Sequence, residues 1–157
     1  MKLVILLLLA CSHLFAQSKV AYPMYNHCME SYKKSPDKLP RKILVQIDKL
    51  KFPNHNYSIM IEITDGKRFA NKTYFLKKDG FKAAFVIDNV AEDVCIFEPQ
   101  NFDNINVKLQ YRYKESNLMR GEVALGTSSV NLKYIKPEGT TVPLAHDGET
   151  SVKLSGE

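Results

Sequence analysis

The clearest strand signature in this 157-residue chain is YSIMIEIT, residues 57–64. Isoleucine stands at positions 59, 61 and 63 and alternates with Met60 and Glu62. Successive side chains of a strand point to opposite faces of a sheet, so this alternation predicts a strand with one buried face. Asp65-Gly66 follows directly and is a turn signal, which ends the strand.

The same two-residue period recurs along the rest of the chain. Further candidate strands cover residues 43–47, 69–76, 81–87, 107–113, 121–125 and 130–135, and a short apolar run lies at 94–97. A last hairpin is expected from 142–144 and 151–154 around Asp147-Gly148. The aromatic residues expected in the core are Phe75, Phe81, Phe85, Tyr111 and Tyr113. No helical period runs long enough to compete, so we predict an all-β fold, an antiparallel two-sheet sandwich of about eight strands.

The first residues predict an exported protein. Lys2 precedes a compact apolar run at 3–10, and small residues at Ala16 and Ser18 offer cleavage sites, so residues 1–18 are interpreted as a secretory signal peptide. An alternative places a bacterial lipoprotein signal at Leu8-Leu9-Ala10-Cys11. Residues 19–41, with prolines at 23, 36 and 40, are expected to form an irregular N-terminal arm, and residues 42–157 the sandwich. We expect the mature protein to be secreted.

Two cysteines remain once such a signal is removed, Cys28 and Cys95. An even number of cysteines in an oxidising compartment favours a disulfide between them, the alternative being two buried free thiols. No CxxC motif and no Cys/His cluster is present, so a metal site is not expected. Asn56-Tyr57-Ser58 and Asn71-Lys72-Thr73 are glycosylation acceptors in a secreted eukaryotic protein, which makes Asn56 and Asn71 candidate glycan sites.

The composition excludes several functional classes. Apolar residues make up 45% and charged residues 25% of the chain, which is ordinary for a globular domain. The formal charge of +5 is too weak to predict nucleic-acid binding. No nucleophile elbow, His-Glu-x-x-His or phosphate-cradling glycine loop is present, so we expect neither an enzyme nor a cofactor.

The order of strands resembles that of C2 domains over roughly residues 41–135. Residues 42–50 resemble the first strand of that family, and Tyr57 occupies the place of the aromatic that opens the second. Asn71-Lys72-Thr73, the aromatic stretch 81–85, and residues 105–111 and 118–125 resemble the later strands. The resemblance implies a binding module that contacts lipid or protein.

The loops depart from the calcium-binding members of that family. Those domains hold Ca²⁺ with several aspartates, and a hard cation needs several charged oxygen ligands. The first loop here offers Asn54, His55 and Asn56, and in the third, residues 112–117, Glu115 is the sole acid. The resemblance therefore implies a calcium-independent domain.

Six basic residues are candidate contacts for an anionic membrane surface or an extracellular protein. Lys108 and Arg112 share a strand parity and project from one face, whereas the resemblance implies a basic groove along the third and fourth strands. The candidates are Lys72, Lys77, Lys78, Lys82, Lys108 and Arg112. The alternative is a solvated face whose lysines protect sheet edges. Phe52 and Phe102 are candidate exposed loop aromatics.

The sequence thus predicts a secreted, non-enzymatic, calcium-independent C2-like binding module. One alternative is an extracellular structural or adhesion-type sandwich with no lipid binding. Another is a carrier of hydrophobic cargo between the sheets, which would require a cavity.

Overall fold

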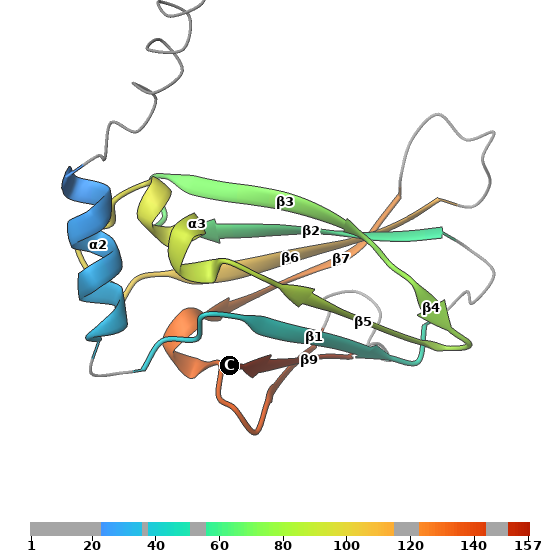
Figure 1. Cartoon of the computed structure of the whole chain (residues 1–157). Helices are drawn as coiled ribbons and strands as arrows, with labels where there is room; N and C mark the ends of the chain where they lie inside the picture. Colours follow the sequence, from blue (N-terminus) through green and yellow to red (C-terminus); the bar gives the residue numbers. More distant parts are fainter. Residues whose placement is uncertain (1–22, 36–37, 51–55, 115–122, 144–150) are drawn as a thin grey trace, which may run out of the picture.

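The computed structural model describes residues 23–35, 38–50, 56–114, 123–143 and 151–157 (Figure 1). The expected signal peptide 1–18, the residues Phe52, Asn54, His55 and Glu115, and Asp147-Gly148 all lie outside these ranges. The elements in chain order are α2 (Pro23–Lys33), β1 (Ile43–Asp48), β2 (Asn56–Thr64), β3 (Phe69–Phe75), β4 (Lys78–Asp79), β5 (Lys82–Ile87), α3 (Val90–Ile96), β6 (Asn106–Lys114), β7 (Val123–Asn131), the 3₁₀ turn η1 (Leu132–Tyr134), β8 (Thr140–Pro143) and β9 (Ser151–Gly156).

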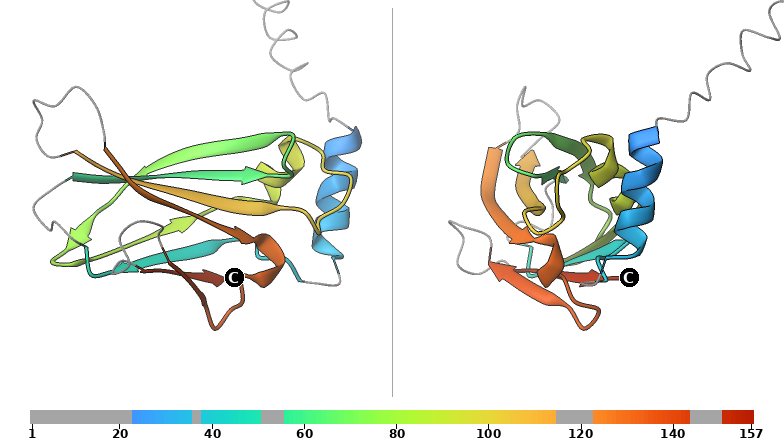
Figure 2. Two further views of the ribbon diagram at one scale, coloured as in Figure 1. Left: turned by 180° about the vertical axis from the view of Figure 1, so that it is seen from behind. Right: turned by 90° about the vertical axis from the view of Figure 1, so that its left-hand side faces the viewer.

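The strands form two antiparallel sheets packed face to face, which confirms the predicted sandwich (Figure 2). One sheet has the order β4-β5-β1-β9-β8 and the other the order β3-β2-β6-β7. The expected last hairpin is the antiparallel pair β8–β9. Among the described helices, none is long and apolar enough to cross a membrane.

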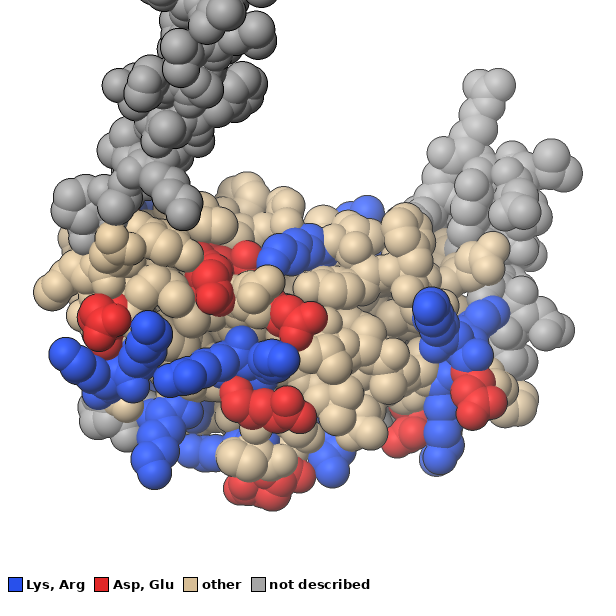
Figure 3. Space-filling view, viewed as in Figure 1, with Lys and Arg blue, Asp and Glu red and all other residues tan. Residues whose placement is uncertain are grey.

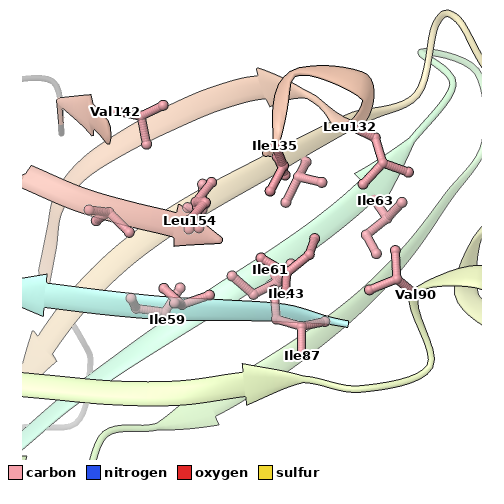
Figure 4. Packing of buried hydrophobic residues seen from close by; sticks show 14 of the residues in the cluster. Ile43, Ile59, Ile61, Ile63, Ile87, Val90, Leu132, Ile135, Val142 and Leu154 are labelled. Carbon is pink, nitrogen blue, oxygen red and sulfur yellow. The ribbon is translucent and has the colours of Figure 1, made fainter. Parts of the chain in front are cut away.

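The core lies between the centres of the two sheets. Ile59 and Ile63 of β2 and Ile43 of β1 are fully buried (Figure 4), and so is Ile47 of β1. The β2 residues between them, such as Met60 and Glu62, face outward and are half-buried. This alternation is the one predicted from the sequence. Removing an isoleucine side chain from water contributes about 2 kcal/mol, so these rows hold the sheets together.

The chain passes from one sheet to the other between β3 and β4, and this crossing corrects two core predictions. The register pairs Ile59 with Tyr74, which places Tyr74 inward and the next residue, Phe75, outward. Tyr74 stacks on Phe85 with ring centroids 4.7 Å apart. Phe75 is 79% exposed, and Phe81, which precedes β5 in a turn, is 59% exposed. Of the other expected core aromatics, Tyr111 is buried, and Phe85 and Tyr113 are partly buried against the core.

The expected irregular arm contains a helix. Helix α2 stands across one end of the sandwich, with Tyr32 buried against the ring of Phe102 at a centroid distance of 5.4 Å (Figures 1 and 2). The Tyr32 hydroxyl donates a hydrogen bond to the carbonyl of Pro40. Pro23 suits the first position of a helix, where no backbone N–H is needed. The buried face is short, so it does not stand out as a period in the sequence.

Two further segments are helical, although their sequence patterns are compatible with a strand. The apolar run at 94–97 belongs largely to α3, which buries Val90, Ala91, Val94 and Cys95. A run of four apolar residues is compatible with either period. The predicted strand at 130–135 becomes η1 after Asn131, whose side chain accepts a hydrogen bond from the backbone N–H of Lys133.

The predicted disulfide between Cys28 and Cys95 is present and joins α2 to α3. It closes a loop with a sequence separation of 67 residues, and Cys95 is fully buried. In the chain-entropy view, such a cross-link stabilises mainly by restricting the unfolded chain. The bond therefore fixes α2 to the end of the sandwich.

We expect the double substitution Cys28→Ala/Cys95→Ala to lower the free energy of unfolding by about 4 kcal/mol, the value for a loop of this length. Urea denaturation followed by far-UV circular dichroism measures it. Wild-type protein with and without reductant is the control, and reduction should produce a similar loss. An unchanged unfolding midpoint in both experiments would contradict the stabilising role of the bond.

Candidate functional site: an aromatic and basic tip

The end of the sandwich away from α2 is where the chain passes from β3 through β4 to β5 (Figure 1). We call this end the tip. It consists of Phe75, Phe81, Lys49, Lys77, Lys78 and Lys82. The space-filling view shows basic side chains at this end, with acidic residues beside them (Figure 3). The tip therefore combines apolar rings with positive charge.

Backbone hydrogen bonds hold the tip to the sandwich. The N–H of Leu50, which is buried, donates to the carbonyl of Phe81 at 2.7 Å. The N–H of Leu76 donates to the carbonyl of Tyr57 at 2.9 Å. Between β4 and β5 the chain turns at Gly80, whose φ of 57° is the left-handed region that glycine adopts without strain. Phe81 is thus fixed at the backbone while its ring remains exposed.

Lysines outnumber acids at the tip. Lys82 lies 3.9 Å from Asp48, and both side chains are largely exposed, so this ion pair is weak. The amine of Lys78 lies 5.8 Å from the ring centroid of Tyr57, a buried residue. Lys49 and Lys77 are exposed and form no ion pair within the described ranges. The tip is left with positive charge available for a partner.

This combination of aromatic rings and lysines suits a surface that has an apolar interior beneath a layer of anionic groups. An aromatic ring brings a large apolar area with few rotatable bonds. A lysine close to an anionic membrane contributes about 1 kcal/mol of attraction. The exposed rings and lysines of the stretch 75–82 can supply both terms.

Three of the six predicted basic residues lie together at the tip: Lys77, Lys78 and Lys82. Lys108 and Arg112 lie instead on the outer face of the sheet β3-β2-β6-β7. Lys108 pairs with Glu62 at 3.1 Å, and the Arg112 guanidinium donates to the side-chain oxygen of Gln110.

Arg112 is closer to the tip than Lys108 in the register of this sheet. Ser58 pairs with Phe75 on one side and with Arg112 on the other, so these residues form one cross-strand row. The row of Lys108 contains Glu62 and, on β3, Asn71. The predicted glycan site Asn71 is exposed on this outer face, and Asn56 is exposed at the start of β2.

Lys72 has a different environment from the other five. It points to the inner side of β3, and its amine lies 2.6 Å from a carboxylate oxygen of Asp93 in α3. Asp93 is only 5% exposed, so this ion pair links the edge strand β3 to the helix α3 at a buried carboxylate. Burial raises the pKa of the neighbouring Tyr74 hydroxyl, while the positive charge of Lys72 acts to lower it.

Sequence reasoning missed Lys49, Phe75 and Phe81 as tip residues. The signal is present in the sequence, because Lys77-Lys78-Asp79-Gly80 is typical of a turn and Phe75 and Phe81 stand close to its two ends. Residues next to a turn need not follow the face of the adjoining strand. The candidate exposed residue Phe102 is partly buried and packs against the core.

Within the described ranges, no three His, Cys, Asp or Glu side chains come together in a way that would hold a metal ion.

No protein-family model matches the chain, and no curated protein matches its sequence. Among solved structures, it is similar to a C2 domain of plant extended synaptotagmin 1, with 12% identity and a TM-score of 0.45 over 75% of this chain and 97% of that one. It is also similar to a structure described as "CC2D1B coordinates ESRCT-III activity during the mitotic reformation of the nuclear envelope", with 12% identity and a TM-score of 0.47 over 76% of this chain and 55% of that one.

A structure of two C2 domains of extended synaptotagmin 2 matches with 13% identity and a TM-score of 0.37, over 85% of this chain and 49% of that one. Two of these three structures are thus described as C2 domains, the family that the strand patterns of the sequence resemble. At these identities and TM-scores no residue role is carried over to this chain.

Removing the amine in Lys72→Ala leaves the buried Asp93 carboxylate without this ion pair, so we expect the free energy of unfolding to fall by about 1–3 kcal/mol. Lys72→Ala/Asp93→Asn should be less destabilised than the sum of the single variants. Urea denaturation of the four proteins in a double-mutant cycle measures this. Additive single effects would show that the pair contributes nothing.

Proposed function

We propose that this protein is a secreted, non-enzymatic binding module that docks its tip on anionic lipid surfaces without calcium. The observation that carries the proposal is the exposure of Phe75 and Phe81 beside the lysine-bearing turn. The rings would enter the interfacial region of the bilayer, and Lys49, Lys77 and Lys82 would contact anionic headgroups.

The tip supports this docking better than the outer sheet face does. Lys108 already has Glu62 as a partner, and its row includes Asn71. A glycan on Asn71 would hold a flat membrane away from that face. The tip carries two exposed rings, and its turn between β4 and β5 lies at the end of the sandwich away from α2 (Figure 1).

Secretion is supported by the signal-like composition of residues 1–18 and by the disulfide between Cys28 and Cys95, a bond typical of oxidising compartments.

Calcium independence is supported by the loop compositions, since residues 112–117 carry a single acid, Glu115, beside Arg112 and Lys114. A loop of that charge repels a divalent cation.

Vesicle co-sedimentation tests the proposal, with phosphatidylcholine vesicles compared with vesicles containing phosphatidylserine, in calcium or chelator. We expect binding to the anionic vesicles alone, weakened by salt and indifferent to calcium. Lys77→Gln/Lys82→Gln removes two charges and should weaken binding about 30-fold, which corresponds to about 1 kcal/mol per lysine. Phe75→Ser/Phe81→Ser should weaken binding even at low salt.

The matched control is Lys38→Gln/Lys136→Gln, which removes two exposed charges at the α2 end and should leave vesicle binding unchanged. No pelleting with any vesicle would refute the lipid proposal and favour an extracellular structural sandwich. A loss confined to Lys108→Glu/Arg112→Glu would move the contact from the tip to the sheet face.

A further inference from the structure

A second basic region lies at the opposite end of the molecule, beside the end of α2. It surrounds an open pocket of about 710 Å³, with Lys38, Lys133 and Lys136 among the residues that line it. Asp103 and Tyr134 also line the pocket. This volume falls within the range of ligand sites in proteins. The pocket shares no residue with the tip.

The side chains of this pocket project from well-anchored backbone. Leu132 is fully buried, and its N–H donates to the carbonyl of Ile105 at 2.8 Å. Ile135 is also buried, so Lys133 and Tyr134 are held between two core residues. On the other wall, Lys38 immediately precedes the buried residue Leu39. The pocket is therefore formed by the folded chain itself and needs no partner to assemble it.

Positive charge exceeds negative charge among the residues that line the pocket. Lys133 lies 3.9 Å from Asp103, whose side chain is 64% exposed, so water weakens this pair. Lys38 and Lys136 are exposed and form no ion pair within the described ranges. The pocket is suited to an anionic group.

Two features distinguish this pocket from a uniformly cationic patch. Tyr134 presents a ring that is 57% exposed, with the Lys133 amine 5.4 Å from its centroid. Its backbone is held by the Thr140 hydroxyl, which donates to the Tyr134 carbonyl at 2.6 Å. Asp103 offers carboxylate oxygens, which accept hydrogen bonds from hydroxyl groups. The pocket thus offers cations, a flat apolar ring and a hydroxyl acceptor together.

We propose that this pocket binds an anionic polysaccharide, one whose pyranose rings carry sulfate or carboxylate groups. Lys38, Lys133 and Lys136 pair with the anionic groups. The ring of Tyr134 packs against the apolar face of a sugar, and Asp103 accepts a hydrogen bond from a sugar hydroxyl. A flat membrane fits a recessed pocket poorly, whereas a single saccharide chain enters it.

Heparin oligosaccharides are the test probe, titrated by calorimetry into the folded, disulfide-bonded protein over a series of salt concentrations. We expect binding that weakens as salt rises. Lys38→Gln/Lys136→Gln should weaken it at least ~10-fold and reduce the slope of log affinity against log salt by about one for each lysine removed. Tyr134→Ala should weaken binding with no change in that slope, because stacking releases no counterions.

The matched control is Lys67→Gln/Lys108→Gln, which removes two exposed charges that belong to neither the tip nor the pocket and should leave heparin binding unchanged. Equal loss in this control, or no heparin binding at low salt, would overturn the proposal. Binding of a DNA duplex as tightly as heparin, with Tyr134→Ala silent in both, would assign the pocket to polyanions in general and overturn its assignment to sugars.

Failure here is distinguishable from failure of lipid docking. Vesicle binding depends on the tip variants, and heparin binding depends on the variants of the pocket.

Discussion

Two rows of buried side chains face each other across the interior, and the remaining structure depends on their packing. In one sheet β2 lies between β3 and β6, and in the other β1 lies between β5 and β9. Both strands turn isoleucine inward, at Ile59, Ile61 and Ile63 of β2 and at Ile43 of β1 (Figure 4), and also at Ile47 of β1. A slip of one residue in either register would exchange the buried face for the polar one. This constraint fixes which side chains of every neighbouring strand face inward.

The two ends of the sandwich differ in what covers the core, and this difference decides which residues each end exposes. At one end, α2 covers the core with Tyr32 and is bonded to α3 through Cys28 and Cys95. That covered end presents the pocket around Lys38 and Tyr134. At the other end the chain crosses between the sheets after Phe75, and no described helix covers it (Figure 1). Its aromatic rings are therefore left in solvent.

The placement of lysines shows why a count of charges does not define a surface. Lys72 and Lys77 are close neighbours in the chain, yet the first pairs with a buried carboxylate and the second stands exposed at the tip. The charge of Lys108 is balanced by that of Glu62 on the outer face of a sheet. Each of these lysines adds the same charge to the sequence. Only the lysines without a nearby acidic side chain can use their full positive charge to bind an anionic partner.

The sequence by itself predicted the class of fold and favoured a disulfide between Cys28 and Cys95 over two free thiols. Alternation at residues 57–64 and in the other strands reports directly which face is buried, because side chains of a strand alternate. With two cysteines left after the expected signal peptide, one intramolecular pairing was possible.

The tertiary structure decided what local patterns leave open. The helical turns of α2 and α3 are too short to show a period, and their stability comes from packing against the sandwich. Whether Phe75 or Tyr74 faced the core depended on the register between β3 and β2, which the sequence of β3 does not contain. Most of the tip is one continuous stretch, residues 75–82, so its composition can be read in the sequence, and the fold adds Lys49 to it through the backbone hydrogen bond between Leu50 and Phe81. The pocket instead combines three separate segments, at residues 38, 103 and 133–137, and their proximity arises from the packing of the two sheets.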